Sequence, residues 1–170
     1  MRIRFTLKNM KFINGFTAKI VLLFIFFLLG CGSRGESVNQ DLIQDLKNLT
    51  AFDSKKHKVV LIMPSSGCSG CIAAVEEFVR DNKFPSLFLI LTNSVSQKDA
   101  VYRLNLVNPL CDYFWDSNKT FYDSKDSEAI YPKIVYWNDG DWLNSRVVIV
   151  KPENPNAMVE LWDYLINLKF

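Results

Sequence analysis

The chain has 170 residues, of which 49% are hydrophobic and 22% charged, and its formal net charge is +2. Five of its 20 Lys and Arg residues lie in the first 30 residues, which hold no Asp or Glu, so residues 31–170 carry 15 basic and 18 acidic side chains. A net charge of −3 over these 140 residues leaves no basic patch to bind nucleic acid, which excludes that class of partner. The segment is long enough for one domain with its own hydrophobic core.

The first 30 residues have the pattern of a bacterial export signal. A basic beginning is followed by the apolar run 20–29, which is shorter than the roughly 20 residues that cross a membrane and has the length of a signal-peptide core. The run ends in Leu28-Leu29-Gly30-Cys31, which resembles the lipobox of bacterial lipoproteins. The resemblance implies cleavage before Cys31, a lipid on that cysteine, and a periplasm-facing position on the inner or outer membrane. An uncleaved signal anchor with an incidental cysteine is the alternative.

Residues 31–37 are expected to be a short polar tether, and residues 38–170 the folded domain. Apolar residues at 42, 43, 46 and 49 have helical spacing, with Asn39 or Asp41 as the expected cap. After a polar turn, in which His57 is expected to face solvent, the apolar run 59–63 predicts a buried strand.

Cys68-Ser69-Gly70-Cys71 follows this strand and precedes an amphipathic helix that is expected to open at Ile72. Two cysteines three residues apart on the first turn of a helix lie close enough for a disulfide, which requires Cα atoms about 4.4–6.8 Å apart. The helix N-terminus also favours the thiolate form of Cys68. Position and spacing together predict a redox dithiol.

The second half of the domain predicts the rest of an α/β sheet. The apolar run 87–91 is typical of a strand buried on both faces, and with 59–63 it predicts a parallel pair joined by a right-handed crossover. The turn residues Asp139-Gly140 predict a hairpin. The remaining predicted elements are a helix at 96–106, a strand at 112–116, hairpin strands at 134–137 and 146–150, and a helix starting at 155–156.

This order of elements resembles the thioredoxin fold, an α/β fold with a central mixed β-sheet flanked by helices, over residues 38–170. The nearest branch is the membrane-tethered, thioredoxin-like proteins of the bacterial envelope. A second landmark of the family is a cis-proline that begins the strand facing the dithiol, and Tyr131-Pro132 stands at that place. The resemblance implies that Pro132 packs beside the cysteines and that Tyr131 offers backbone hydrogen bonds to a substrate peptide.

The resemblance also implies a membrane-anchored thiol–disulfide oxidoreductase without a cofactor. Cys68 would attack a disulfide of an envelope protein, Cys71 would resolve the mixed disulfide, and a redox partner would restore the dithiol. Three features depart from the family: Gly67 replaces the usual aromatic residue before the first cysteine, Ile62 replaces a buried carboxylate, and Ser69-Gly70 lacks the histidine of strongly oxidising relatives. The first two favour a second hypothesis, a non-catalytic lipoprotein that binds a partner and whose disulfide is structural.

A metal site is the third hypothesis. Structural zinc takes about four nitrogen or sulfur ligands, and beyond the pair only Cys111 and His57 are candidates. Because His57 precedes the strand 59–63 and the pair follows it, roughly 15–20 Å separate them, which argues against a shared metal. Cys111 is expected to be a small buried side chain, with a role as a second exchange partner left open.

Overall fold

The computed structural model of the chain describes residues 34–82, 84–94, 96–104, 106, 111–138 and 141–168. The expected signal segment 1–30, the lipidation site Cys31 and the Asp139-Gly140 turn lie outside the described residues. The chain divides into two units, Met1–Ser37 and Val38–Phe170, and the fold below is that of the second. Among the residues described, no helix combines the length and the apolar character needed to cross a membrane.

The described residues form four helices and five strands, a mixed α/β fold. In chain order they are α2 (Arg34–Asn48), β1 (Val59–Pro64), α3 (Ser69–Asp81), β2 (Leu87–Thr92), α4 (Gln97–Arg103), β3 (Asp112–Asp116), β4 (Lys133–Asn138), β5 (Asp141–Ile149) and α5 (Ala157–Asn167).

The strands and helices expected from the sequence are all present, but several of their beginnings were wrong. Helix α2 starts at Arg34, so neither Asn39 nor Asp41 caps it, and residues 34–37 of the expected tether are helical. Strand β5 starts at Asp141 rather than at residue 146, and its first residue pairs with Asn138 of β4.

The five strands form one mixed sheet in the order β3-β2-β1-β4-β5. Strands β1, β2 and β3 are parallel, and β4 is antiparallel to both β1 and β5. Pro64 pairs with Thr92 and Thr92 with Asp116, so the three parallel strands end at one edge of the sheet. Cys68 and Cys71 follow β1, which is the central strand of the five-stranded sheet.

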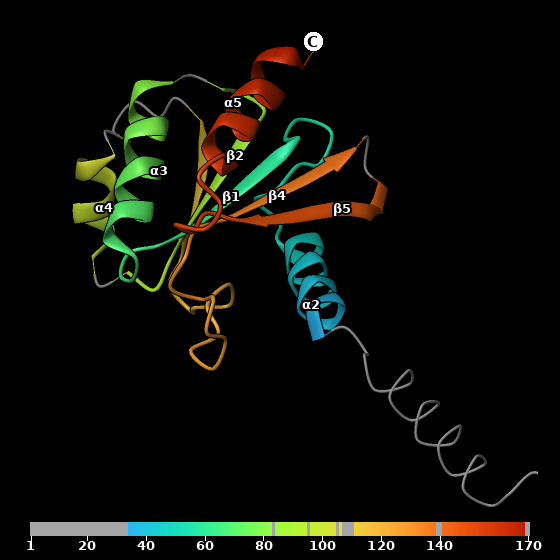
Figure 1. Cartoon of the computed structure of the whole chain (residues 1–170), viewed down its shortest axis with the longest axis horizontal. Coiled ribbons are helices and arrows are strands. Elements are labelled where there is room, and N and C mark those ends of the chain that lie inside the picture. The colour runs from blue at the N-terminus through green and yellow to red at the C-terminus, as the bar shows by residue number, and fades with distance from the viewer. Residues whose placement is uncertain are drawn as a thin grey trace, which may run out of the picture. The chain divides into compact units, whose positions relative to one another are not determined.

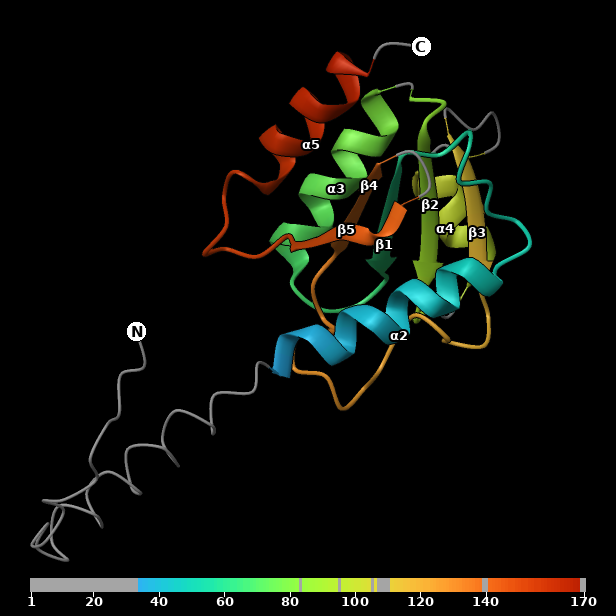
Figure 2. The same cartoon turned by 90° about the vertical axis from the view of Figure 1, so that its right-hand side faces the viewer.

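Helices cover both faces of the sheet, with α3, α4 and α5 on one and α2 on the other (Figures 1 and 2). Leu61 and Leu89 face α3, whereas Val60 and Phe88 face α2, and all four are fully buried. Burial on both faces explains why β1 and β2 are continuous apolar runs rather than alternating ones. Each fully buried aliphatic side chain contributes about 1.5–3 kcal/mol.

His57 is buried, with 1% of its surface exposed, so the prediction that it faces solvent was wrong. Its Nδ1 accepts a hydrogen bond from the Asp53 N–H at 3.3 Å, and its Nε2 lies 2.9 Å from the Asp112 carboxylate. Its ring packs against Phe52 and Phe88. A histidine whose two nitrogens both have partners can be buried without leaving a polar group unsatisfied.

Cys111 lies at the start of β3 and is buried, as expected, with 6% of its surface exposed. Burial, and secondarily the neighbouring Asp112 carboxylate, raises the pKa of the Cys111 thiol to about 12. Lys56 donates a hydrogen bond to the same Asp112 carboxylate as His57. Because Cys111 directly precedes β3 and the Cys68–Cys71 pair follows the end of β1, they lie at opposite ends of the parallel strands.

Candidate functional site

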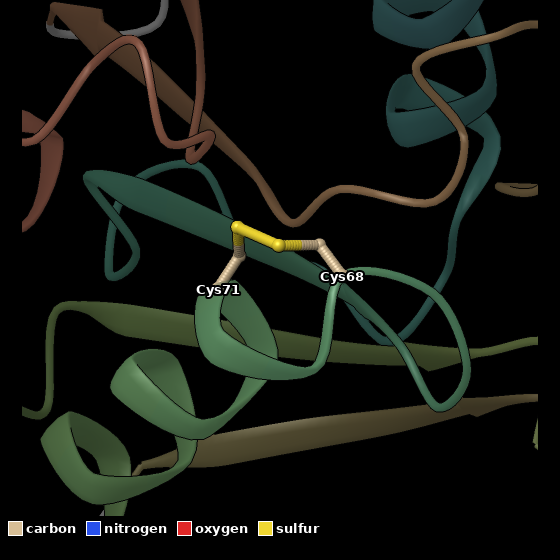
Figure 3. The surroundings of a disulfide bond; sticks show 2 residues. All are labelled: Cys68 and Cys71. Carbon is tan, nitrogen blue, oxygen red and sulfur yellow. A yellow bond between two sulfur atoms is a disulfide. The ribbon is translucent and has the colours of Figure 1, made fainter.

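Cys68 and Cys71 form a disulfide at the first turn of α3 (Figure 3). Cys68 is the N-cap residue, and its carbonyl accepts a hydrogen bond from the Ile72 N–H at 2.9 Å. The two Cα atoms are 5.3 Å apart, as the spacing predicted. The helix begins at Ser69, three residues before the expected start, so Cys68 adjoins the free N–H groups of its first turn. These groups favour a thiolate when the disulfide is open.

The two cysteines of the pair differ in exposure. Cys71 is buried in the core between α3 and the sheet, with 8% of its surface exposed, whereas Cys68 is half-buried. The small residues around Cys68 are exposed, namely Ser66, Gly67, Ser69 and Gly70. Residues 59–75 include no charged side chain. A substrate sulfur approaching from solvent therefore reaches Cys68 before Cys71.

Gly67 allows a distant segment of the chain to lie against Cys68. Its φ is +147°, a conformation that favours glycine, and a Cβ at this position would overlap the carbonyl group of Ile130. The same carbonyl accepts a hydrogen bond from the Cys68 N–H at 3.1 Å. An aromatic residue at position 67 would displace this contact. The contact with Ile130 was not predicted, although the glycine was its signal in the sequence.

The Tyr131–Pro132 bond was expected to be cis, and this was wrong: no peptide bond among the described residues is cis. Trans is the intrinsically favoured form of such bonds by about 0.5–1 kcal/mol. In this protein the segment bonds the dithiol turn through Ile130, two residues before the proline. The Tyr131 N–H donates to the Glu128 carbonyl at 3.1 Å, and the Pro132 carbonyl accepts from the Val150 N–H at 2.9 Å. Tyr131 packs against the core that includes Cys71, and Pro132 is buried.

Two ion pairs fix the segment that carries Ile130. Lys133 lies 2.8 Å from Asp126, and Lys151 lies 3.1 Å from Glu128. Burial tends to raise the pKa of Asp126, but the hydrogen bonds from Lys133 and from the Glu128 N–H outweigh burial and lower it. Asp126 is therefore a charged anchor for the residues that approach Cys68.

Asn93, directly after β2, holds the turn on the other side of Cys68. Its carbonyl accepts a hydrogen bond from the Ser65 hydroxyl at 2.6 Å, and its side-chain amide donates to the Ser66 hydroxyl at 3.1 Å. Its φ is +52°, which asparagine tolerates better than most residues. These contacts were not predicted; their signal was an asparagine at the end of an apolar strand that pairs with the strand before the dithiol.

The other positions that entered the sequence analysis lie away from the pair. Ile62 is buried in the core that faces α2. His57 and Cys111 lie at the opposite edge of the sheet. Within the described ranges, no group of three or more His, Cys, Asp or Glu side chains is arranged to hold a metal ion.

Searches against protein-family models, curated proteins and solved structures gave no match. The mixed α/β fold and the Cys68–Cys71 pair at Cys-x-x-Cys spacing are compatible with a thioredoxin-like fold. The pair is consistent both with a redox-active and with a structural disulfide.

Proposed function

We propose that this chain is a thioredoxin-like thiol–disulfide oxidoreductase, anchored in the bacterial envelope, that reduces or exchanges disulfides of envelope proteins. One observation carries the proposal: a half-buried Cys68 at the N-terminus of α3 is joined to a buried Cys71 in the first turn of the same helix. This asymmetry suits the two thiols to different steps, attack and resolution.

In the reductive direction, the Cys68 thiolate attacks one sulfur of a substrate disulfide. A bond forms between Cys68 and that sulfur, and the other substrate sulfur leaves as a thiolate that takes a proton from water. Cys71 then loses its proton and attacks the Cys68 sulfur, which forms the Cys68–Cys71 disulfide and releases the second substrate thiol. The substrate gains two electrons and two protons. A redox partner with a dithiol then reduces the Cys68–Cys71 disulfide and is itself oxidised to a disulfide.

Tyr131 and Pro132 form the wall of the site that contacts the substrate polypeptide. This part of the proposal rests on Tyr131 packing against the core that contains Cys71 and on the hydrogen bond from Cys68 to the preceding Ile130. Since the Tyr131 N–H is bonded to Glu128, we expect the Tyr131 side chain rather than its N–H to contact the substrate.

A turnover assay tests the exchange chemistry. The full chain in detergent should accelerate the reduction of insulin by dithiothreitol, which is itself oxidised to its cyclic disulfide. A Cys68→Ser variant serves as the control because it lacks the attacking sulfur. Equal rates with the two proteins would refute the oxidoreductase proposal. A Cys71→Ala variant should accumulate mixed disulfides with its partners, because nothing resolves them.

The envelope anchor is a separate part of the proposal and rests on the Leu28-Leu29-Gly30-Cys31 motif. In a bacterial host, the chain should incorporate labelled palmitate and sediment with membranes, whereas a Cys31→Ala variant should not incorporate the label. Incorporation by both proteins, or by neither, would refute lipidation at Cys31.

A partner-binding lipoprotein with a structural disulfide is the second candidate, favoured by the Cys68 N–H and the Tyr131 N–H both being engaged within the chain. This alternative predicts no acceleration of insulin reduction. It also predicts that a Cys68→Ser/Cys71→Ser double variant still binds the partner. The insulin assay therefore distinguishes the two proposed functions.

A further inference from the structure

We infer that Asn93 is a positioning residue that sets the redox equilibrium of the Cys68–Cys71 pair. It lies outside the dithiol motif, 27 residues from Ser66 in sequence, yet its amide group holds the turn that leads into Cys68. The inference deepens the proposed function and rests on it only for its biological meaning, because the equilibrium is measurable whether or not the chain turns over.

The turn before Cys68 is held from two sides, by Asn93 and by Ile130. Asn93 bonds Ser65 through its carbonyl and Ser66 through its side chain. Ile130 bonds Cys68 itself through its carbonyl, across the surface that Gly67 leaves open. Between these contacts the backbone of residues 65–68 has little freedom to carry Cys68 away from α3.

These hydrogen bonds matter most when the disulfide is open. In the oxidised protein the sulfur–sulfur bond itself keeps Cys68 beside Cys71. In the dithiol the two cysteines are joined only through Ser69 and Gly70, so the non-covalent contacts around them help determine how much conformational freedom is lost when the disulfide closes. Contacts that hold Cys68 in place therefore favour the disulfide, and their loss favours the dithiol.

The test is the equilibrium of the full chain, in detergent, with glutathione. Two glutathione molecules reduce the disulfide and are joined in oxidised glutathione, so electrons and protons balance. The fraction of dithiol is read on gels after acid quenching and maleimide labelling, and it gives the equilibrium constant. Ser66→Ala removes the acceptor of the Asn93 amide, and Asn93→Gly removes the amide while still permitting the positive φ.

Each substitution should shift the constant toward the dithiol about two- to tenfold, as expected for the loss of one hydrogen bond. Since both remove the same contact, the double variant should shift it no further than the larger single effect. Unchanged constants, or a shift toward the disulfide, would overturn the inference. So would fully additive shifts, because Asn93 would then not act through Ser66.

Thr92→Val is the matched control. Thr92 immediately precedes Asn93 and is buried, but its hydroxyl donates to Asp116 at 2.7 Å, away from the dithiol turn. The variant should be less stable to urea and keep the wild-type equilibrium constant. An equal shift in this control would mean that general loosening of β2 moves the equilibrium, and the positioning role would be rejected. If the chain does not accelerate insulin reduction but the glutathione equilibrium constant still shifts in the Ser66→Ala and Asn93→Gly variants, the positioning role of Asn93 stands and only the oxidoreductase proposal is refuted.

Discussion

Cysteines lie at both edges of the parallel strands, in opposite surroundings. At the carboxyl edge, Cys68 is half-buried among small uncharged residues and held by hydrogen bonds to main-chain groups. At the amino edge, roughly 20 Å away along the strands, Cys111 is buried beside the Asp112 carboxylate. The surroundings of a thiol, rather than its presence on the sheet, therefore decide whether it can take part in exchange.

The largest expected effect is the difference between the alkylation rates of Cys68 at the carboxyl edge and Cys111 at the amino edge. With a pKa of about 12, the Cys111 thiol is ionised to roughly one part in ten thousand at pH 8, and it is also buried. After reduction of the pair, iodoacetamide should modify Cys68 first and leave Cys111 unmodified, with rates that differ by more than about a thousandfold. Mass spectrometry of quenched samples measures the order of modification.

The control for alkylation is the same reaction in 8 M urea, in which Cys111 should react at the rate of a free cysteine. Native-state modification of Cys111 as fast as that of Cys68 would contradict the contrast between the edges. It would also revive the prediction, left open from the sequence, that Cys111 takes part in exchange.

Gly67→Ala should disrupt the carboxyl edge. The substitution places a Cβ against the Ile130 carbonyl at a φ that non-glycine residues rarely adopt, which costs about 1–3 kcal/mol, and it opens the hydrogen bond from Cys68. We expect a loss of about 3 kcal/mol in the free energy of unfolding, measured by urea titration. We also expect a shift of the glutathione equilibrium toward the dithiol.

Gly70→Ala is the matched control for that variant, because Gly70 lies in α3 and a Cβ there has nothing within 4 Å. It should be neutral or stabilising by up to about 1 kcal/mol, since alanine is the better helix former. Similar destabilisation by the two substitutions would show that the close approach of Ile130 is not what requires glycine at position 67.

The His57→Phe substitution tests how much the hydrogen bonds of His57 stabilise the amino edge. The ring volume that packs against Phe52 and Phe88 is kept, but the Asp53 N–H loses its acceptor and Asp112 loses one donor. A loss of about 2 kcal/mol is expected, with an unchanged glutathione equilibrium. Lys55→Ala, at an exposed position of the same turn, should change stability by less than about 0.5 kcal/mol. A redox shift in His57→Phe would show that the two edges are coupled.

Elements were predictable wherever the information was local. The runs 59–63 and 87–91 identify strands because helices cover both faces, so every position is apolar. The close approach of Cys68 and Cys71 was predictable for the same reason, since a turn, two cysteines and an amphipathic helix follow one another. The mixed sheet followed from the order of these elements.

Contacts between distant segments were not predictable. Ile130 meets Cys68 from 62 positions away, and Asp112 meets His57 from 55 positions away. No periodicity encodes such pairs, because each depends on where the loops cross the ends of the sheet. The errors at His57 and at the Tyr131–Pro132 bond have this origin: each residue was interpreted from its neighbours in sequence, whereas its partners lie elsewhere.

The smallest effect is expected from Asp112→Asn, and it depends on pH. The hydrogen bond from Lys56, and further that from His57, lower the pKa of Asp112 despite some burial. A carboxyl group whose pKa is lower in the folded state stabilises the fold above its unfolded-state pKa of about 3.9, and this contribution disappears as the pH falls through the folded-state pKa.

Urea titrations at pH 7, 5, 3 and 2 should therefore show the wild type to be more stable than Asp112→Asn at pH 7 and 5, with the difference shrinking below pH 4. The difference should stay under about 1 kcal/mol, because the Asp112 side chain is 49% exposed and solvent screens it. Added salt should reduce it further, since an exposed pair is screened. A difference that stays constant from pH 7 to pH 2 would mean that the Asp112 charge does not hold the amino edge together. The glutathione equilibrium should be the same in both proteins, because the dithiol lies at the other end of β1.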